Sequence, residues 1–145
     1  FTVYGPWGRP DMALWLFTEA ILAGRAIKVF NNGDMRRDFT YVDDIVSGIL
    51  AARDKPPVKT DGAAPHRIYN IGNNQPEPLL PLVEVLEESL CRKAERVLQP
   101  MQPGDVKETY ADLTAIQRDL GFKPTTTIEQ GVPQFTAWYR DYHNL

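Results

Sequence analysis

The chain has 145 residues, 43% hydrophobic and 24% charged, which is the composition of one globular domain with a core of its own. The formal net charge of −3 argues against a nucleic-acid partner, so any basic site must be local. The single cysteine, Cys91, allows no internal disulfide and no C-x-x-C metal site, and it favours a reducing, cytoplasmic compartment. No apolar stretch approaches the roughly 18 residues of a membrane span and no signal-peptide pattern is recognisable, so no membrane partner is expected.

The first residues predict a strand that leads into a kinked turn. Phe1 to Tyr4 are strand-forming residues, and Y-G-P-W-G-R-P continues from the last of them. The strand opens with no initiator Met, cap or polar lead-in. Because domains seldom begin inside a strand, we expect the chain to be part of a longer protein. A helix is predicted from Asp11 to Gly24, since Pro10 suits a first turn and Asp11 favours the positive end of the helix dipole.

Short strands and a second helix are predicted next. Ile27 to Phe30 reads as a strand, N-N-G-D at 31–34 as a turn, and Asp38 to Val42 as another strand. Asp43 and Asp44 then stand where they can cap a helix over Ile45–Arg53.

The rest of the chain alternates between loops, strands and amphipathic helices. A surface loop is predicted over 55–66 and a turn over 101–105. Strands are predicted at Arg67–Ile71 and Glu95–Leu98, and helices at Pro78–Arg92, Leu113–Leu120 and Ile128–Tyr142. The whole is therefore an α/β unit with α+β character, built of short strands and about five helices.

Several catalytic arrangements are missing from the sequence. No glycine-rich dinucleotide fingerprint follows a strand, and no tyrosine has a lysine four residues later. The two histidines, His66 and His143, lie in a Pro/Gly loop and near the C-terminus, so neither is placed as a base. No Ser/His/Asp, Cys/His or metal-ligand cluster is recognisable. Hence no catalytic residue and no metal site are predicted.

The turn at residues 5–10 is compatible with an anion. Arg9 precedes a predicted helix N-terminus, where anions are favoured, and its planar guanidinium forms a fork for a carboxylate or phosphate. A local role is equally open at this point, in which Arg9 caps the helix through Asp11.

Four further residues have both a binding and a structural interpretation. Arg36 and Arg37 alternate faces on a strand, so one can point into a cleft while the other is solvated. Asp105, in the turn Q-P-G-D, can accept a ribose hydroxyl or cap its own turn. Phe30, at a strand end, can stack on a base or belong to the core.

Taken together, these stretches resemble the C-terminal, substrate-binding part of the extended short-chain dehydrogenase/reductase enzymes that modify nucleotide sugars. The resemblance covers the chain except residues 54–66. It rests on F-T-V-Y-G-P-W-G-R-P-D-M-A (1–13), I-K-V-F-N-N-G-D-M-R-R-D-F-T-Y-V-D-D-I (27–45), Y-N-I-G-N (69–73), Q-P-G-D-V-K-E-T-Y-A-D (102–112), G-F-K-P-T-T-T-I-E-Q-G-V (121–132) and F-T-A-W-Y-R (135–140). Within the family, residues 2–13 and M-Q-P-G-D-V most resemble the UDP-glucuronate 4-epimerases, which are often classed as capsular-polysaccharide epimerases.

The resemblance implies roles around the sugar. Thr2 would face the hexose at the junction of two lobes, Thr109 would lie at the position that gates sugar size, and Arg9 would meet the glucuronate carboxylate. The chemistry of Arg9 agrees, because a neutral hexose would leave its guanidinium unpaired. The nicotinamide end of the cofactor would lie near Tyr4, Gly5 and Pro6.

It also implies a nucleotide site. Uracil would contact Lys28, Val29 and Phe30. Arg37 would bind the pyrophosphate and Asp105 the uridine ribose. Gln102 stands where many relatives carry a second phosphate-binding arginine.

The resemblance implies interconversion of UDP-glucuronate and UDP-galacturonate at C4, by transient oxidation to a 4-keto sugar with NAD. The family's Tyr/Lys pair and glycine-rich NAD loop belong to an N-terminal domain, so the chain alone is expected to be inactive and to bind UDP weakly. The longer enzyme would be a homodimer. Alternatives are a sister UDP-sugar 4-epimerase, decarboxylase or 4,6-dehydratase, or a non-catalytic module that binds a nucleotide or a partner.

Overall fold

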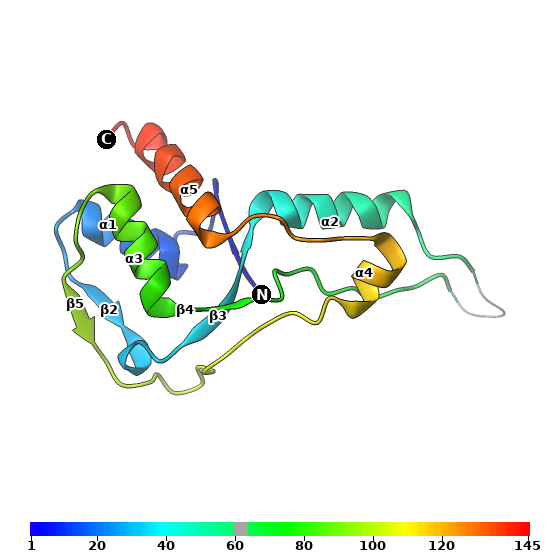
Figure 1. Ribbon diagram of the computed structural model, residues 1–145, viewed down its shortest axis with the longest axis horizontal. Coiled ribbons are helices and arrows are strands. Elements are labelled where there is room, and N and C mark those ends of the chain that lie inside the picture. The colour runs from blue at the N-terminus through cyan, green and yellow to red at the C-terminus, as the bar shows by residue number, and fades with distance from the viewer. Residues whose placement is uncertain (60–63) are drawn as a thin grey trace.

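The computed structural model describes residues 1–59 and 64–145 and contains two hydrophobic clusters along an elongated body (Figure 1). Its helices are α1 (Ala13–Leu22), α2 (Val42–Asp54), α3 (Leu79–Leu90), α4 (Thr114–Leu120) and α5 (Ile128–Tyr142). Its strands are β1 (Thr2–Tyr4), β2 (Ile27–Val29), β3 (Arg36–Tyr41), β4 (Pro76–Pro78) and β5 (Arg96–Leu98), and a 3-10 turn, η1, covers Phe30–Gly33. None of the helices in the described ranges is long and apolar enough to cross a membrane.

The strands form two small sheets. β3 is the middle strand of the first sheet, with β1 parallel on one side and β4 antiparallel on the other. β2 and β5 form a second, parallel pair. One edge of β1 is therefore unpaired within the described chain, although parallel strands are usually buried inside larger sheets.

The larger cluster lies where α1, α3 and α5 meet the first sheet, at the left of Figure 1. α3 is apolar along one face, and its residues Leu82, Val83 and Leu86 have no exposed surface. α5 starts with a capping box between Thr127 and Gln130, which satisfies backbone N–H groups of its first turn. The predicted ranges of α3 and α5 agree with the structure because their apolar residues recur at helical spacing.

The second cluster holds α2, α4 and the intervening segments together at the other end of the molecule. Ala111, Leu113, Ile116 and Phe122 are its buried members. Gly48 lets α2 approach this cluster closely, because a Cβ there would stand 3.0 Å from the Ile71 side chain.

One strand prediction was wrong, and one strand was not predicted. Arg67–Ile71 is extended but pairs with no strand among the described residues, and Ile68 is 74% exposed. Side chains hold this segment instead: the Tyr69 hydroxyl donates to Asp119 (3.3 Å) and Asn70 to the Asp112 carbonyl (3.4 Å). β4 was missed because its sequence is Pro-Glu-Pro, and proline is tolerated in a strand only at an edge, which is where β4 lies.

The predicted helix starts also need correction. α2 begins at Val42, and neither Asp43 nor Asp44 caps it. Buried Asp44 instead accepts hydrogen bonds from the backbone N–H groups of Thr125 and Thr126, both at 3.0 Å. α1 begins at Ala13, two residues after Asp11. Part of the predicted 55–66 loop lies outside the described residues.

Candidate functional site

A groove of about 630 Å³, here called the main groove, opens between α1, β2, η1 and the turn at 102–105. Its floor is apolar, with Leu16, Phe17, Met35 and Phe39. Its polar edges come from segments far apart in sequence and carry Thr2, Lys28, Arg37, Gln102 and Asp105. Apolar lining with a few convergent polar groups is typical of a small-molecule site.

Arg37 and Asp105 meet at the edge of this groove. Arg37 Nη2 donates to Asp105 Oδ1 at 2.7 Å, although the residues are 68 positions apart. Arg37 Nη1 donates to the carbonyls of Arg36 (2.9 Å) and Lys107 (3.1 Å), so the guanidinium is fixed in place. Its Nε and the second hydrogen of Nη2 are not used by these contacts, so donors remain for an anion.

The structural roles that the sequence left open for Asp105 and Arg36 are also observed. Asp105 Oδ1 accepts the Val106 N–H at 2.8 Å and so caps its own turn. Arg36 points away from Arg37, toward Glu108 (3.5 Å) and the Pro76 carbonyl (2.9 Å). The alternation expected for adjacent arginines on a strand is confirmed, with Arg37 at the groove and Arg36 in solvent.

The other predicted nucleotide residues divide into two groups. Lys28 and Phe30 line the main groove, Phe30 through η1 directly after β2. Val29 between them does not, because its side chain is fully buried in the core and its carbonyl accepts the Gln99 N–H at 2.9 Å. Alternation along a strand dictates this difference.

Thr109 also lies away from the groove lining. Its N–H donates to the Arg36 carbonyl at 3.2 Å. Its hydroxyl is buried and has no hydrogen-bond partner in the described part of the chain. A buried hydroxyl without a partner is unfavourable, and the predicted gating role stays a prediction.

A second groove of about 490 Å³, here called the N-terminal groove, is lined by residues around the kinked turn. Tyr4, Gly5, Pro6 and Arg9 all line it. The Tyr4 hydroxyl, however, turns into the core and donates to the Thr127 carbonyl (3.3 Å), and burial raises its pKa. Gly5 is required by packing, since a Cβ there would stand 2.7 Å from Val42. Of the three residues predicted near the nicotinamide, Gly5 and Pro6 therefore offer a ligand their backbone, whereas the Tyr4 hydroxyl is already bonded to Thr127.

Arg9 forms an ion pair with Asp11. Its Nε donates to Oδ1 at 3.1 Å and its Nη2 to Oδ2 at 2.8 Å. The two side chains are 73% and 68% exposed. The local pairing that the sequence left open is therefore present, while the predicted contact with a substrate carboxylate stays a prediction.

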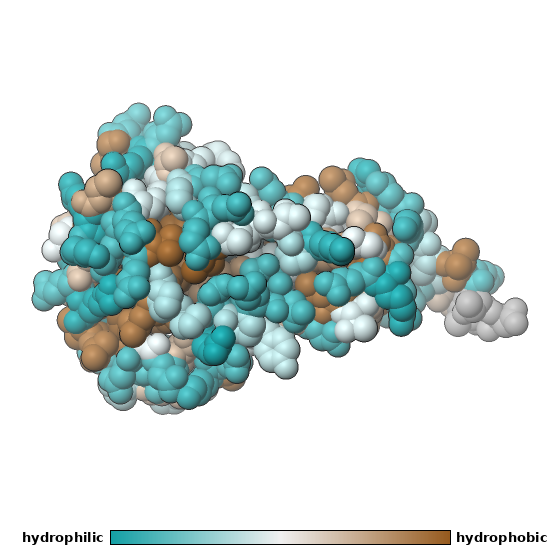
Figure 2. Space-filling view, viewed as in Figure 1, coloured by the Kyte–Doolittle hydropathy of each residue, from teal (hydrophilic) through white to brown (hydrophobic). Residues whose placement is uncertain are grey.

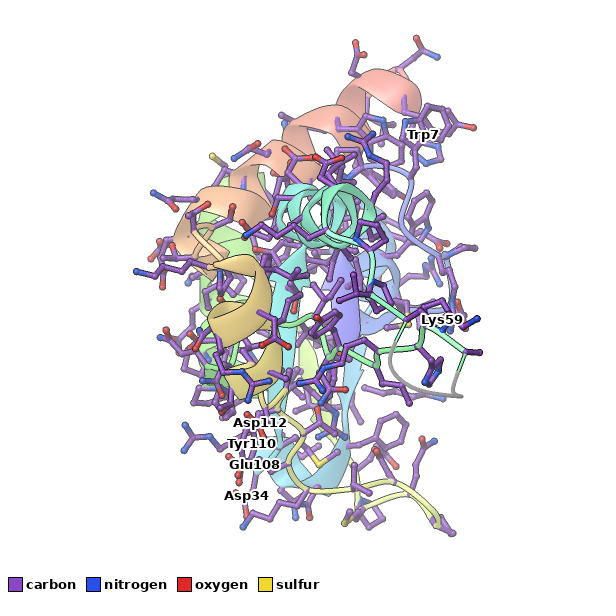
Figure 3. The ribbon with its side chains drawn as sticks, turned by 90° about the vertical axis from the view of Figure 1, so that its right-hand side faces the viewer. Trp7, Asp34, Lys59, Glu108, Tyr110 and Asp112 are labelled. Carbon is purple, nitrogen blue, oxygen red and sulfur yellow. The ribbon has the colours of Figure 1, made fainter. Side chains whose placement is uncertain are left out.

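Trp7 connects the turn that carries Arg9 to α5 although it is 74% exposed, and sequence reasoning missed this contact. Its backbone φ is 63°, a left-handed conformation that is unusual for a bulky residue. The ring packs against Trp138 (5.3 Å between centroids) and Tyr142 (5.1 Å), at the C-terminal end of α5 (Figure 3). Trp138 and Tyr142 are four residues apart and so share one face of α5. This aromatic face was the signal in the sequence that another aromatic residue could pack there.

Asp38 ties three segments together behind the site, and it was also missed. Its fully buried carboxylate accepts the backbone N–H groups of Asn73 (2.7 Å), Asn74 (2.9 Å) and Ala111 (2.8 Å). Gly72 allows this approach, because a Cβ there would meet Ala111 Cβ at 2.4 Å. The network fixes the strand that carries Arg37.

The main groove is more basic than the chain as a whole. Arg25, Lys28 and Arg37 line it against Asp11 and Asp105, whereas the chain has a net charge of −3. This local excess suits an anionic ligand. Within residues 1–59 and 64–145, no group of three His, Cys, Asp or Glu side chains is placed to hold a metal.

Comparisons with known proteins agree on one family. The sequence profile described as the NAD dependent epimerase/dehydratase family matches residues 1–72. Protein CapI of Staphylococcus aureus is 49% identical over 154 residues, covering 99% of this chain and 46% of CapI. UDP-glucuronate 4-epimerase 3 of Arabidopsis thaliana is 47% identical, covering 99% of this chain and 36% of that enzyme.

Solved structures show the same similarity in three dimensions. A crystal structure of UDP-glucuronic acid 4-epimerase from Bacillus cereus in complex with UDP-glucuronic acid and NAD superimposes with a TM-score of 0.85 at 30% identity. The match covers 98% of this chain and 44% of that protein. The chain thus spans less than half the length of these relatives.

Proposed function

Because this chain belongs to the NAD dependent epimerase/dehydratase family, we propose that it is the substrate-binding part of a UDP-sugar 4-epimerase that acts on UDP-glucuronate. The observation that carries the proposal is the main groove, where Lys28, Phe30 and Arg37 converge beside an apolar floor. Its volume of about 630 Å³ falls within the range of small-molecule sites.

Each part of a UDP-sugar has a matching group in this groove. Phe30 offers an aromatic face for the uracil, and Arg37 offers free guanidinium donors for the diphosphate. Asp105, held by Arg37 at 2.7 Å, offers its second carboxylate oxygen to a ribose hydroxyl. Thr2, on β1, lines the same groove on the side toward the kinked turn, where the sugar would lie.

Arg9 is the group that selects an acidic sugar in this proposal. It lies beside the junction of the two grooves, since Met12, three residues later and 3.5 Å from Arg9 Nη2, lines both. A carboxylate can bind its guanidinium through two parallel hydrogen bonds, as Asp11 does here. The neutral hydroxymethyl group of a hexose cannot form two such parallel hydrogen bonds.

NAD, when bound, supplies the hydride acceptor and donor for C4 chemistry. The residues of this chain fit only a small part of that cofactor, namely the backbone at Gly5 and Pro6 in the N-terminal groove. The sequence holds no Tyr-x-x-x-Lys pair. In our proposal this chain binds and orients the sugar, and another domain provides the acid/base pair and most of the NAD site.

The surface next to β1 supports the proposal that a second, NAD-binding domain packs there. One edge of β1 pairs with no strand among the residues that the structure describes, and Val3 on β1 is exposed. On α2, which follows β3, the apolar side chains of Val46, Ile49 and Leu50 are also exposed. A domain that continues the parallel sheet beyond β1 would bury these groups.

Binding and turnover with two sugars test the proposal. We expect the chain to bind UDP-glucuronate weakly but more tightly than UDP-glucose, and a protein that joins it to an NAD-binding domain to epimerise UDP-glucuronate faster. The Arg9→Ala variant should lose about 1.5–3 kcal/mol of binding free energy for the acidic sugar, as expected for a charged hydrogen bond. Submicromolar affinity of the chain alone, or faster turnover of UDP-glucose, would contradict the proposal.

A second candidate is a non-catalytic nucleotide-binding module that uses the same groove, with Phe30, Arg37 and Asp105 at the nucleotide. It predicts tight binding of UDP itself, with no gain from the sugar. Calorimetry with UDP and with UDP-glucuronate separates the two, because only the epimerase proposal expects the glucuronate to add affinity through Arg9.

A further inference from the structure

The Arg9–Asp11 pair has the geometry of the contact that an acidic sugar would make. Two parallel hydrogen bonds, 3.1 Å and 2.8 Å long, join Nε and Nη2 of Arg9 to the two oxygens of Asp11. These are the same donors that would bind a glucuronate carboxylate side-on. This edge of a guanidinium accepts one carboxylate in such a geometry at a time.

The Arg9–Asp11 pair also lies at the boundary of the two grooves, where a bound ligand can break it. Arg9 lines the N-terminal groove, Asp11 lines the main groove, and Met12 lines both. A sugar extending from a nucleotide in the main groove toward the kinked turn reaches the pair at this boundary.

The pair can exchange partners readily. Both side chains are mostly exposed, at 73% and 68%, and exposed ion pairs stabilise a protein only slightly. Backbone hydrogen bonds from the Gly8 N–H to the Gly5 carbonyl (3.1 Å) and from the Met12 N–H to the Arg9 carbonyl (3.2 Å) close the turn. Arg9 can therefore change partner by rotating its side chain alone.

We propose that Asp11 is a specificity-determining residue that occupies the guanidinium of Arg9 until a sugar carboxylate displaces it. This inference rests on the proposed function, because it needs an acidic sugar. The carboxylate of Asp11 is an internal substitute for that of the substrate. Because Asp11 pairs with Arg9, a neutral sugar does not leave the guanidinium unpaired, contrary to the expectation from the sequence. Asp11 also reduces the affinity for the acidic sugar, because that sugar must displace it.

The test compares UDP-glucuronate with UDP-glucose on the full chain and its variants. In Asp11→Asn the competing carboxylate is removed while the side chain keeps its size. We expect UDP-glucuronate to bind about two- to five-fold more tightly, the range given by the small stability of an exposed pair. UDP-glucose should bind with unchanged affinity. NMR titration suits the weak binding expected.

Matched variants exclude a general charge effect. Asp54→Asn removes one charge from a similarly exposed pair, Arg53–Asp54, which lies outside both grooves, and should change neither affinity. Asp11→Glu keeps a carboxylate and should restore the lower affinity for UDP-glucuronate. In an Arg9→Ala background the effect of Asp11→Asn should vanish.

The Asp11 carboxyl resonance gives a second readout. Its hydrogen bond with Arg9 lowers the pKa of Asp11, so displacement by UDP-glucuronate should move this pKa back up, and UDP-glucose should leave it low. Equal tightening for both sugars in Asp11→Asn would overturn the inference and indicate long-range electrostatics. Weaker UDP-glucuronate binding in Asp11→Asn would overturn it too, and would mean that Asp11 positions Arg9. If wild type does not prefer UDP-glucuronate, the proposed function fails instead.

Discussion

At the scale of single residues, buried carboxylates connect segments that are distant in sequence. Asp38, Asp44 and Glu87 each accept at least one backbone N–H from a different segment. A carboxylate offers two oxygens with about four acceptor positions, so one side chain can satisfy several N–H groups that would otherwise be buried unpaired. These three acids therefore stabilise the frame that positions Arg37 and the grooves.

Asp38→Asn tests this role. The amide would place an NH₂ group against N–H donors, so at least one of the three backbone contacts is lost inside the core. We expect the free energy of unfolding to fall by about 2–3 kcal/mol, measured by urea denaturation. Asp43→Asn, at an exposed position on α2, is the control and should change it by less than about 0.5 kcal/mol.

At the scale of elements, Glu87 joins α3 to β5. Its carboxylate, 2% exposed, receives hydrogen bonds from Lys93 (2.7 Å), Arg96 (2.8 Å) and the Ala94 N–H (3.2 Å). Burial by itself would raise the pKa of Glu87, but these donors outweigh it, and the pKa lies below its ordinary value. Since β5 pairs with β2 and with no other strand in residues 1–59 and 64–145, this contact helps to hold the second sheet against α3.

Removing the charge at Glu87 should loosen that sheet. We expect Glu87→Gln to lower the free energy of unfolding by about 1.5–3 kcal/mol, because charged hydrogen bonds to Lys93 and Arg96 are weakened. Glu84→Gln, on the exposed face of the same helix, provides the comparison. An equal loss in both variants would mean that the effect comes from helix propensity and not from β5.

The contact between the 67–71 segment and α4 should be sensitive to acid. Arg118 lies beside Asp119 and, together with Arg67 and the Tyr69 hydroxyl, holds the Asp119 pKa at about 2. A carboxyl group whose pKa is lower in the folded state stabilises the fold fully at any pH above its ordinary pKa. This stabilisation is lost as the pH falls toward the folded pKa. We therefore expect the contact of this segment with Asp119 to open between about pH 4 and pH 2, seen as a change in the ring resonances of Tyr69, whose hydroxyl donates to Asp119. Asp119→Asn should show the same change already at neutral pH. Tyr69 resonances that stay unchanged across this range would contradict the prediction.

At the scale of the whole molecule, apolar surface is unevenly distributed. Figure 2 shows apolar residues gathered over the end that carries β5, where Val97 and Leu98 are exposed. α2 and β1 add Val46, Ile49 and Val3. Exposed apolar groups beside an unpaired strand edge favour association with another polypeptide.

A lysine on α2 tests whether this face drives association. Ile49→Lys should leave the free energy of unfolding within about 0.5 kcal/mol, because the side chain is already 55% exposed. Concentration-dependent association, followed by analytical ultracentrifugation, should decrease. Ile68→Lys, on the extended segment, serves as the control with no such effect. A large loss of stability in Ile49→Lys would show that the side chain contributes to the core instead.

The agreement between prediction and structure depends on the range of the interactions involved. The α/β class with five helices was predicted and is confirmed, and so is the family resemblance. The strand predicted at Arg67–Ile71 was wrong, because its apolar side chains pack on the cluster around α4 and the segment does not pair with another strand. β4 was missed because a Pro-Glu-Pro strand has no propensity signal at all.

The sequence by itself determined the helical segments and the family resemblance, because periodicity, turn residues and motifs are local properties of the chain. Of the residues it predicted for the nucleotide, Lys28, Phe30, Arg37 and Asp105 line the main groove, whereas Val29 does not. Only the tertiary structure decided which of those residues meet. It paired Arg37 with Asp105 across 68 residues, and it directed Asp44 to Thr125 instead of its own helix. It also assigned Arg9 to Asp11, one of two partners the sequence left open. The physical reason is that a charged side chain can satisfy its hydrogen bonds with any nearby partner, and chain folding determines which partners are near.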